Sequence, residues 1–166
     1  MAIDIGSPAI DRPVGITTGT FIDLNNPAEF NFTIHEVQVW FKTNATGVRV
    51  GTFYRVSYNQ TFGWLYKCRA STPEGVAISG GSLQTIAAAI TALIGDYIGC
   101  YFVDGTLAMT QSDAGADDVR IITGGGECID PGDQGYTGGW ATSRISVYGT
   151  ESPIPPLTGA GVAQII

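Results

Sequence analysis

The chain has 166 residues, of which 44% are hydrophobic and 14% charged, and its formal net charge is −7. Disorder requires low hydrophobicity together with high charge, so this composition excludes a disordered chain, and the 23 glycines and 8 prolines predict a globular domain with many turns. An acidic chain with only two lysines also lacks the basic patch of a nucleic-acid-binding protein.

The first residues, MAIDIGSPAI, lack a basic stretch followed by an apolar run, so we predict no secretory signal. Prolines and glycines are frequent over residues 1–20, which include Pro8 and Pro13. Proline cannot donate a backbone hydrogen bond, so we expect any strand in this region to be short and to lie at the edge of a sheet.

Residues 32–42 alternate between apolar and polar side chains, with Val37, Val39 and Phe41 on one face. This period of two predicts a half-buried strand, because successive side chains of a strand point to opposite faces. His35 falls on the apolar face of that pattern. We therefore interpret it as a histidine of the core or of the end of the sheet, rather than as a catalytic base.

Two further alternating runs, residues 48–57 and 64–70, predict the next strands, and Gly47 in the loop before them suits a left-handed position in a hairpin. Later candidates are short and are separated by turn signals such as Asp104-Gly105 and Gly138-Gly139. The remaining predicted strands are residues 75–79, 96–103, 106–110, 119–123 and 144–148.

Residues 82–94 leave two interpretations open. Alanines, Ser82 as a cap and Gly95 as a stop are typical of a short helix, whereas the frequent Thr and Ile residues favour a strand, which we prefer slightly. The apolar run 86–102 is interrupted by Asp96 and is too short for a membrane span, so it predicts buried core. An odd number of cysteines argues against a disulfide framework, and we expect Cys68 and Cys100 to be core side chains instead of a bridge.

Together these elements predict an all-β protein: a single antiparallel β-sandwich, jelly-roll-like, over residues 1–150. Residues 151–166 read as an extended C-terminal arm, because a proline-rich stretch there precedes an apolar end. Such an arm either frays or docks on a neighbouring molecule. The residues that define it are Pro153, Pro155, Pro156, Val162, Ile165 and Ile166.

The sequence assembles no catalytic constellation, so we expect a protein that is not an enzyme. The single histidine is the only candidate base for a catalytic triad, and the sequence holds neither a zinc motif nor a phosphate-binding loop. Two acidic segments carry loop carboxylates, the ligands that Ca²⁺ accepts, although solvated turns are the favoured interpretation and we expect no cofactor. Paired carboxylates would also suit a glycosidase, the least favoured alternative. The acidic residues concerned are Asp113, Asp117, Asp118, Asp130 and Asp133.

The three tryptophans are candidates for a ligand platform. Trp40 falls on the polar face of its predicted strand, and Trp64 and Trp140 each follow a glycine. An exposed aromatic ring stacks well on a sugar, because it offers an apolar face with a polar rim. Burial in the core or at an interface is the commoner fate of a large aromatic side chain, and both interpretations stay open.

The order of short motifs resembles the jelly-roll-like β-sandwich modules of structural proteins from tailed phages and prophages. The likeness rests on GVRVG at residues 47–51, GDYIG at 95–99 and SVYG at 146–149, within about residues 3–151. The resemblance implies a decoration or tail-appendage subunit of a virion, made in the host cytoplasm. It also implies a homo-oligomer, with a trimer favoured, that contacts other virion proteins. The acidic composition and the interrupted apolar run predict no nucleic-acid and no membrane partner. The alternative is a carbohydrate- or receptor-binding module that uses the aromatic residues and the acidic loops.

Overall fold

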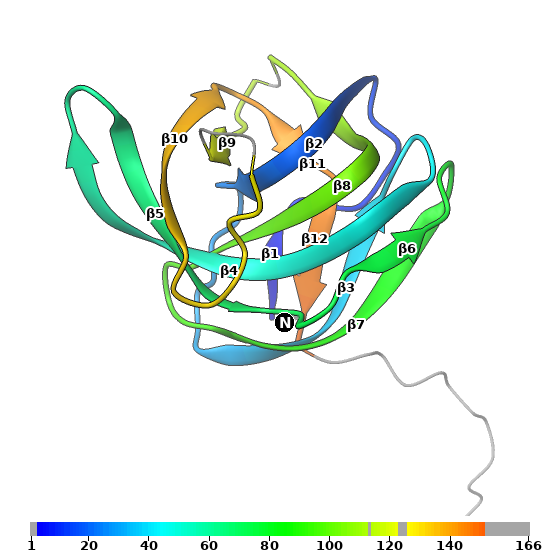
Figure 1. The fold of residues 1–166 in the computed structure, drawn as a ribbon, viewed down its shortest axis with the longest axis horizontal. Coiled ribbons are helices and arrows are strands. Elements are labelled where there is room, and N and C mark those ends of the chain that lie inside the picture. The colour runs from blue at the N-terminus through cyan, green and yellow to red at the C-terminus, as the bar shows by residue number, and fades with distance from the viewer. Residues whose placement is uncertain (1–2, 113, 123–125, 152–166) are drawn as a thin grey trace, which may run out of the picture.

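The structure, a computed structural model, describes residues 3–112, 114–122 and 126–151, and every regular element in these ranges is a strand (Figure 1). The strands are β1 (Asp4–Gly6), β2 (Val14–Asp23), β3 (Phe32–Trp40), β4 (Ala45–Asn59), β5 (Gly63–Ser71), β6 (Val76–Ile78), β7 (Leu83–Ala92), β8 (Tyr97–Thr110), β9 (Val119–Ile122), β10 (Gln134–Trp140), β11 (Arg144–Ile145) and β12 (Val147–Thr150).

The strands form two antiparallel sheets that pack as a sandwich, which confirms the predicted fold class. The smaller sheet has the order β1-β12-β3-β7, and the larger has the order β11-β8-β2-β9-β10-β5-β4-β6. β8 also pairs with β4. The prolines of the predicted arm, with Val162, Ile165 and Ile166, lie outside the described residues.

The extra pairing closes the larger sheet on itself. Gly99 in β8 lies opposite Ile22 of β2 on one edge and opposite Gly51 of β4 on the other. The strands β8, β2, β9, β10, β5 and β4 therefore form a closed ring, which we call the barrel. Glycine is required at Gly99, because a Cβ atom there would lie 2.4 Å from the carbonyl oxygen of Phe21. The curved ribbons of β4, β5 and β10 are visible in Figure 1.

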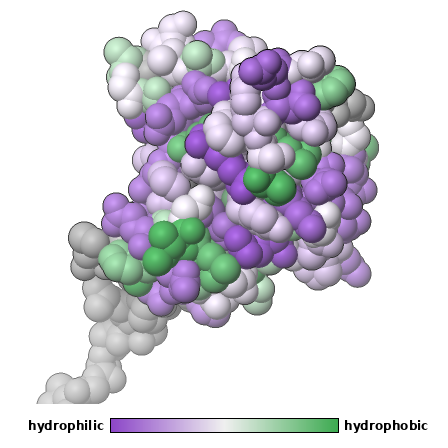
Figure 2. All heavy atoms as spheres, turned by 90° about the vertical axis from the view of Figure 1, so that its left-hand side faces the viewer, coloured by the Kyte–Doolittle hydropathy of each residue, from purple (hydrophilic) through white to green (hydrophobic). Residues whose placement is uncertain are grey.

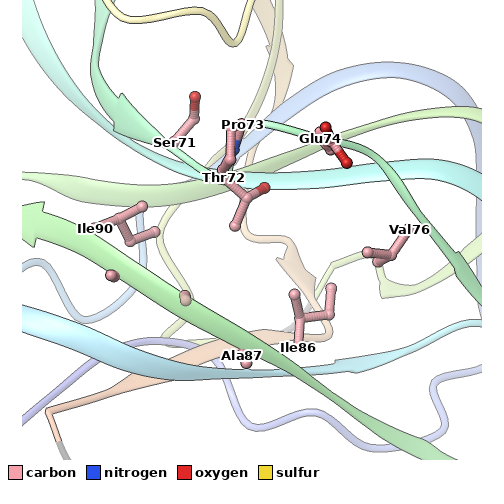
Figure 3. Close-up of a pocket in the computed structure, with 10 residues that line it drawn as sticks. Ser71, Thr72, Pro73, Glu74, Val76, Ile86, Ala87 and Ile90 are labelled. Carbon is pink, nitrogen blue, oxygen red and sulfur yellow. The ribbon is translucent and has the colours of Figure 1, made fainter.

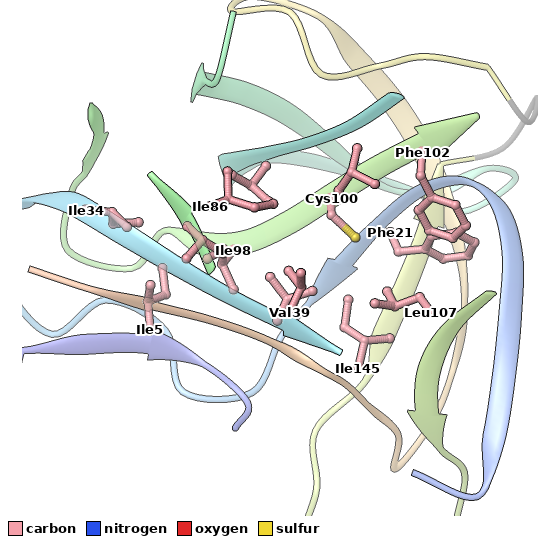
Figure 4. Close-up of a cluster of buried hydrophobic side chains, with 14 of the residues drawn as sticks. Ile5, Phe21, Ile34, Val39, Ile86, Ile98, Cys100, Phe102, Leu107 and Ile145 are labelled. Carbon is pink, nitrogen blue, oxygen red and sulfur yellow. The ribbon is translucent and has the colours of Figure 1, made fainter. Parts of the chain in front are cut away.

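The strands β2, β4 and β8 separate two hydrophobic cores. In β8, Ile98, Cys100 and Phe102 join the core between the sheets (Figure 4), whereas Tyr97 and Tyr101 pack against the core of the barrel. A strand that is covered on both faces carries a continuous apolar run instead of an alternation. This arrangement explains why the sequence around residues 97–102 is apolar almost throughout.

Several sequence predictions hold and others are wrong. Residues 82–94 contain the strand β7, as preferred, and Gly47 has a φ of +64°. The expectation of only short edge strands in residues 1–20 is wrong for β2, which has ten residues and lies between β8 and β9. Its proline, Pro13, directly precedes the strand and so costs it no hydrogen bond. The Asp104-Gly105 signal marks no strand end, because β8 continues through it with Gly105 at a φ of +118°.

His35 is exposed, so its predicted place on the apolar face is wrong. The register between β3 and β7 shifts between Ile34 and Glu36, and this irregularity breaks the alternation of the strand. Ile34 and Val37 are consequently both buried although they are three residues apart. A pattern of period two cannot reveal such a shift.

Candidate functional site

An exposed arginine that contacts several aromatic rings lies on the wall of the barrel. Arg55 extends from β4, and its Nε–H donates a 2.8 Å hydrogen bond to the hydroxyl oxygen of Tyr66 on β5. Its guanidinium carbon lies 4.9 Å from the ring centre of Trp64 and 5.2 Å from that of Tyr97. Arginine stacks well on aromatic faces, so these contacts fix a side chain that would otherwise be mobile.

An acidic segment lies beside this arginine. Asp117 and Asp118 immediately precede β9, and the backbone N–H of Asp117 donates a 2.7 Å hydrogen bond to Oδ1 of Asn25. Asn25 is itself buried, and its side-chain amide donates to the carbonyl oxygen of Ser143 at 2.8 Å and to the carboxylate of Asp23. A buried polar network therefore holds the acidic segment in place.

These groups line a pocket of about 320 Å³. Asp118 is ion-paired with Arg120, whose Nε–H is buried and has no hydrogen-bond partner among the described residues. Arg55 uses its Nε–H on Tyr66, and its terminal N–H groups make no hydrogen bond to the described residues, so they can donate to a ligand. We call this site the Arg55 pocket; its lining residues are Leu24, Pro27, Arg55, Tyr97, Asp117 and Asp118.

The tyrosine under Arg55 is a buried positioning residue. Burial raises the pKa of Tyr66 above its ordinary value of 10.0, and the hydrogen bond and charge of Arg55 oppose this rise. Tyr66 therefore remains neutral at physiological pH, and its oxygen accepts the hydrogen bond from Arg55. The ring of Tyr66 also meets that of Tyr97 edge-on at 6.0 Å, which links the two walls of the site.

The hairpin formed by β4 and β5 extends this site with more aromatic side chains. It projects from the body of the molecule in Figure 1. Tyr58 and Phe62 near its tip are each 60% exposed. The ring of Tyr58 contacts that of Trp64 at 5.2 Å, on the side of Arg55, whereas the ring of Phe62 contacts that of Tyr136 at 5.3 Å. Tyr136 pairs with Leu65, the neighbour of Trp64, so it lies on the opposite face of the sheet. Figure 2, which views this side of the molecule, shows small hydrophobic patches among hydrophilic residues. The pocket thus opens beside an amphipathic surface.

The structure separates the three tryptophans that the sequence grouped as platforms. Trp64 belongs to the Arg55 pocket region. Trp140 stacks on Phe21 at 6.2 Å and packs against the sandwich core, and Trp40 is half-buried on β3 in the other sheet. They cannot act as one platform, and Trp64 is the one that contacts Arg55.

Carboxylates of the second acidic segment form ion pairs with a different arginine, Arg49. Arg49 is buried, pairs with Asp130 at 2.8 Å and with Glu127, and donates from Nε to the carbonyl oxygen of Thr72 at 2.9 Å. Asp113 lies outside the described residues. Among the residues that are described, no three His, Cys, Asp or Glu side chains group in a way that could hold a metal ion.

The three cysteines are free and buried. Cys100 lies in the sandwich core, whereas Cys68 and Cys128 lie in the barrel core, so the expected core role of Cys68 and Cys100 is confirmed. Burial raises the pKa of Cys68 to about 12 and that of Cys128 to about 11, with the nearby Asp133 contributing to both. Neither thiol is a reactive thiolate at neutral pH.

Sequence reasoning missed the residue at the centre of the site. No motif in the sequence singles out Arg55, Tyr66 or Tyr97. Arg55 and Trp64 belong to the consecutive predicted strands 48–57 and 64–70, which is a usable signal for their proximity. Nothing in the sequence indicated that β8 and the segment before β9 would join them.

Comparisons with known proteins give no match: no family model, no curated protein and no solved structure is similar to this chain. The resemblance to phage structural modules consequently stays a prediction. The part of the chain that the structure describes contains no helix of the length and hydrophobicity needed to span a bilayer.

Proposed function

We propose that the chain is a carbohydrate-binding module, and that the Arg55 pocket and the aromatic hairpin beside it hold an oligosaccharide. The observation that carries the proposal is the guanidinium of Arg55, held against Trp64 and Tyr97 beside Asp117 and Asp118. Sugar hydroxyls both donate and accept hydrogen bonds, so they suit a site that pairs arginine donors with aspartate acceptors. Apolar sugar faces suit an exposed aromatic ring such as Tyr58, which contacts Trp64.

The proposed ligand is a neutral glycan. The chain carries a formal net charge of −7, and the two aspartates of the pocket would repel an acidic sugar. The function is binding rather than hydrolysis, because the carboxylate of Asp118 is already paired with Arg120. A general acid would instead need a carboxyl group that keeps its proton.

A glycan array followed by calorimetry tests this proposal. Arg55→Ala and Trp64→Ala are each expected to weaken binding about tenfold or more, corresponding to about 1.4 kcal/mol. Lys67→Ala is the control, because Lys67 is a cation of the same hairpin that does not line the pocket. Thermal unfolding verifies that each variant is folded. Failure of the unaltered chain to bind any neutral glycan, or full binding by Arg55→Ala, would overturn the proposal.

We also propose a second role, as a structural subunit of a virion: a capsid decoration or tail-appendage protein that assembles as a homo-oligomer. The specific observation in its favour is the edge of β7, which pairs with no described strand on the side away from β3. Assemblies of identical subunits commonly cover such edges. Mass spectrometry of purified virions tests this role: detection of the chain supports it, and absence from intact particles contradicts it.

A further inference from the structure

An apolar groove runs along the unpaired edge of β7 (Figure 3). One wall is the segment 71–76, which leads from β5 into β6, and the other is formed by residues 86–90 of β7. Its volume is about 420 Å³, larger than that of the Arg55 pocket. Ile86, Ala88 and Ile90 contribute to the sandwich core at its margin. The small side chain of Ala88 leaves the space open.

The groove lies where both sheets end. β7 is the last strand of the smaller sheet, and β6 is the last of the larger, among the strands that the structure describes. A free strand edge offers a row of backbone donors and acceptors, and an adjacent apolar groove offers space for alternate side chains. This combination suits an added extended segment better than a compact ligand.

The chain holds a segment of matching chemistry. Residues 162–166, VAQII, are mostly apolar and β-branched, and they contain no proline, so every backbone N–H can pair. Thr150, near the end of β12, lies opposite Glu36, which lies opposite Ala87 at the groove. The described chain therefore ends about 10 Å, or two strand spacings, from the strand that lines the groove.

We propose that residues 162–166 of one copy add as a strand to the free edge of β7 on a second copy, with their apolar side chains in the groove. The inference deepens the proposed assembly role and rests on it. β12 and β7 both run antiparallel to β3, so the chain leaves β12 parallel to β7. The nine residues 153–161, with prolines at 153, 155 and 156, span about 28 Å when extended, well beyond the copy's own edge.

Light scattering at several protein concentrations tests this docking. The full chain is expected to be an oligomer, and a chain ending at Glu151 is expected to be a monomer. A synthetic peptide of residues 152–166 should bind the shortened chain. Val76→Arg on the groove wall should abolish peptide binding and oligomer formation; Val76 is 38% exposed, so the variant is expected to fold. Val56→Arg is the matched control, because Val56 is 47% exposed and lies outside the groove.

The outcomes separate the alternatives. Oligomers of unchanged mass after removal of residues 152–166, or no peptide binding, would overturn the docking even if the chain is found in virions. A full chain that is monomeric while the peptide binds the shortened chain would place the segment on its own copy and overturn the exchange between copies. Glycan binding by the shortened chain is expected to be unchanged, so failure of the groove and failure of the Arg55 pocket are distinguishable.

Discussion

The two cores of this molecule are built on the same strands but have different chemistry. The sandwich core consists of aliphatic and aromatic side chains together with Met109 and Cys100, and it includes Phe102, whose ring stacks on that of Phe21 and meets that of Phe41 edge-on. The barrel core contains a tyrosine and two cysteines, and Arg55 and Trp64 border it. Some polar groups of the barrel are paired, as when Tyr66 accepts from Arg55, whereas the buried Nε–H of Arg120 has no hydrogen-bond partner among the described residues.

This difference suggests that the sandwich core stabilises the fold and that the barrel wall binds the ligand. Apolar packing without polar groups gives the largest stabilisation per residue, so the sandwich is the stable frame. Polar residues at the barrel wall contribute less to stability because their desolvation offsets their interactions, yet they supply the directed contacts that recognition needs. We expect substitutions in the sandwich core to lower the unfolding stability most, and substitutions in the barrel wall mainly to weaken glycan binding.

Phe102→Ala is expected to have the largest effect. Phe102 is fully buried, and its ring lies 5.7 Å from that of Phe21 and 5.1 Å from that of Phe41. Loss of such a side chain costs about 3–5 kcal/mol, because a cavity remains. Urea unfolding measures the change. Val103→Ala is the control, because Val103 is 55% exposed and its loss should change stability by less than about 0.5 kcal/mol. An equal loss of unfolding free energy at both positions would contradict the role of the sandwich core as the main source of stability.

Asp23→Asn should stabilise the protein near neutral pH. Burial raises the pKa of Asp23 from 3.8 to about 6, although hydrogen bonds from Asn25 lower it in part. The stabilisation by the protonated form is fully present below about pH 3.8 and is lost as the pH rises through about 6. Since one pKa unit corresponds to about 1.4 kcal/mol, the gain at pH 8 is about 3 kcal/mol.

Thermal and urea unfolding at pH 4 and pH 8 check this dependence. The gain should be small at pH 4, where the native carboxyl group is already neutral. Glu74→Gln is the control, because Glu74 is exposed and should show no comparable change. An equal gain at both pH values would show that the amide acts through new contacts rather than through the removed charge.

The sequence was sufficient to predict the sandwich but not the barrel. Alternation in β3 beyond Glu36 follows from local chemistry, because one face of the strand meets a core, whereas β4 is buried on both faces over residues 48–53. β10 was missed because Gly138 and Gly139 suggest a turn. Gly139 instead allows a close approach of two strands, because a Cβ atom on it would lie 2.7 Å from the carbonyl oxygen of Val119. Only the pairing of β10 with β9 and β5 reveals this role.

The candidate site was predictable only in part, for a related reason. Trp64 and the aspartates 117 and 118 were identified by residue type, and the structure brings them to one region. Arg55 joins them because the closure of β8 onto β4 creates the barrel wall. Such long-range pairing depends on contacts between distant segments, which leave no local periodicity in the sequence.

Gly99→Ala sharpens the comparison, because Gly99 lies in the strand that both cores share. A Cβ atom there would lie 2.4 Å from the carbonyl oxygen of Phe21 and 2.8 Å from the ring of Phe53. Overpacking of this kind costs about 1–3 kcal/mol, and it should weaken both unfolding stability and glycan binding. Ala108→Gly, a one-carbon change elsewhere in β8, is a control for general weakening of the strand. Unchanged stability in Gly99→Ala would contradict the close packing at the barrel closure.

Tyr66→Phe should have the smallest effect on stability and a selective effect on binding. The ring stays in the barrel core, and only the hydroxyl that accepts from Arg55 is lost. Such a hydrogen bond contributes about 1 kcal/mol to stability. Arg55 then keeps its stacking on Trp64 and Tyr97 but loses the bond that fixes its orientation, so glycan affinity should fall more than that of Lys67→Ala. Calorimetry that finds the glycan affinity unchanged, together with a lower unfolding stability, would show that Tyr66 only stabilises the fold. The assignment of the barrel wall to ligand binding would then be wrong at this position.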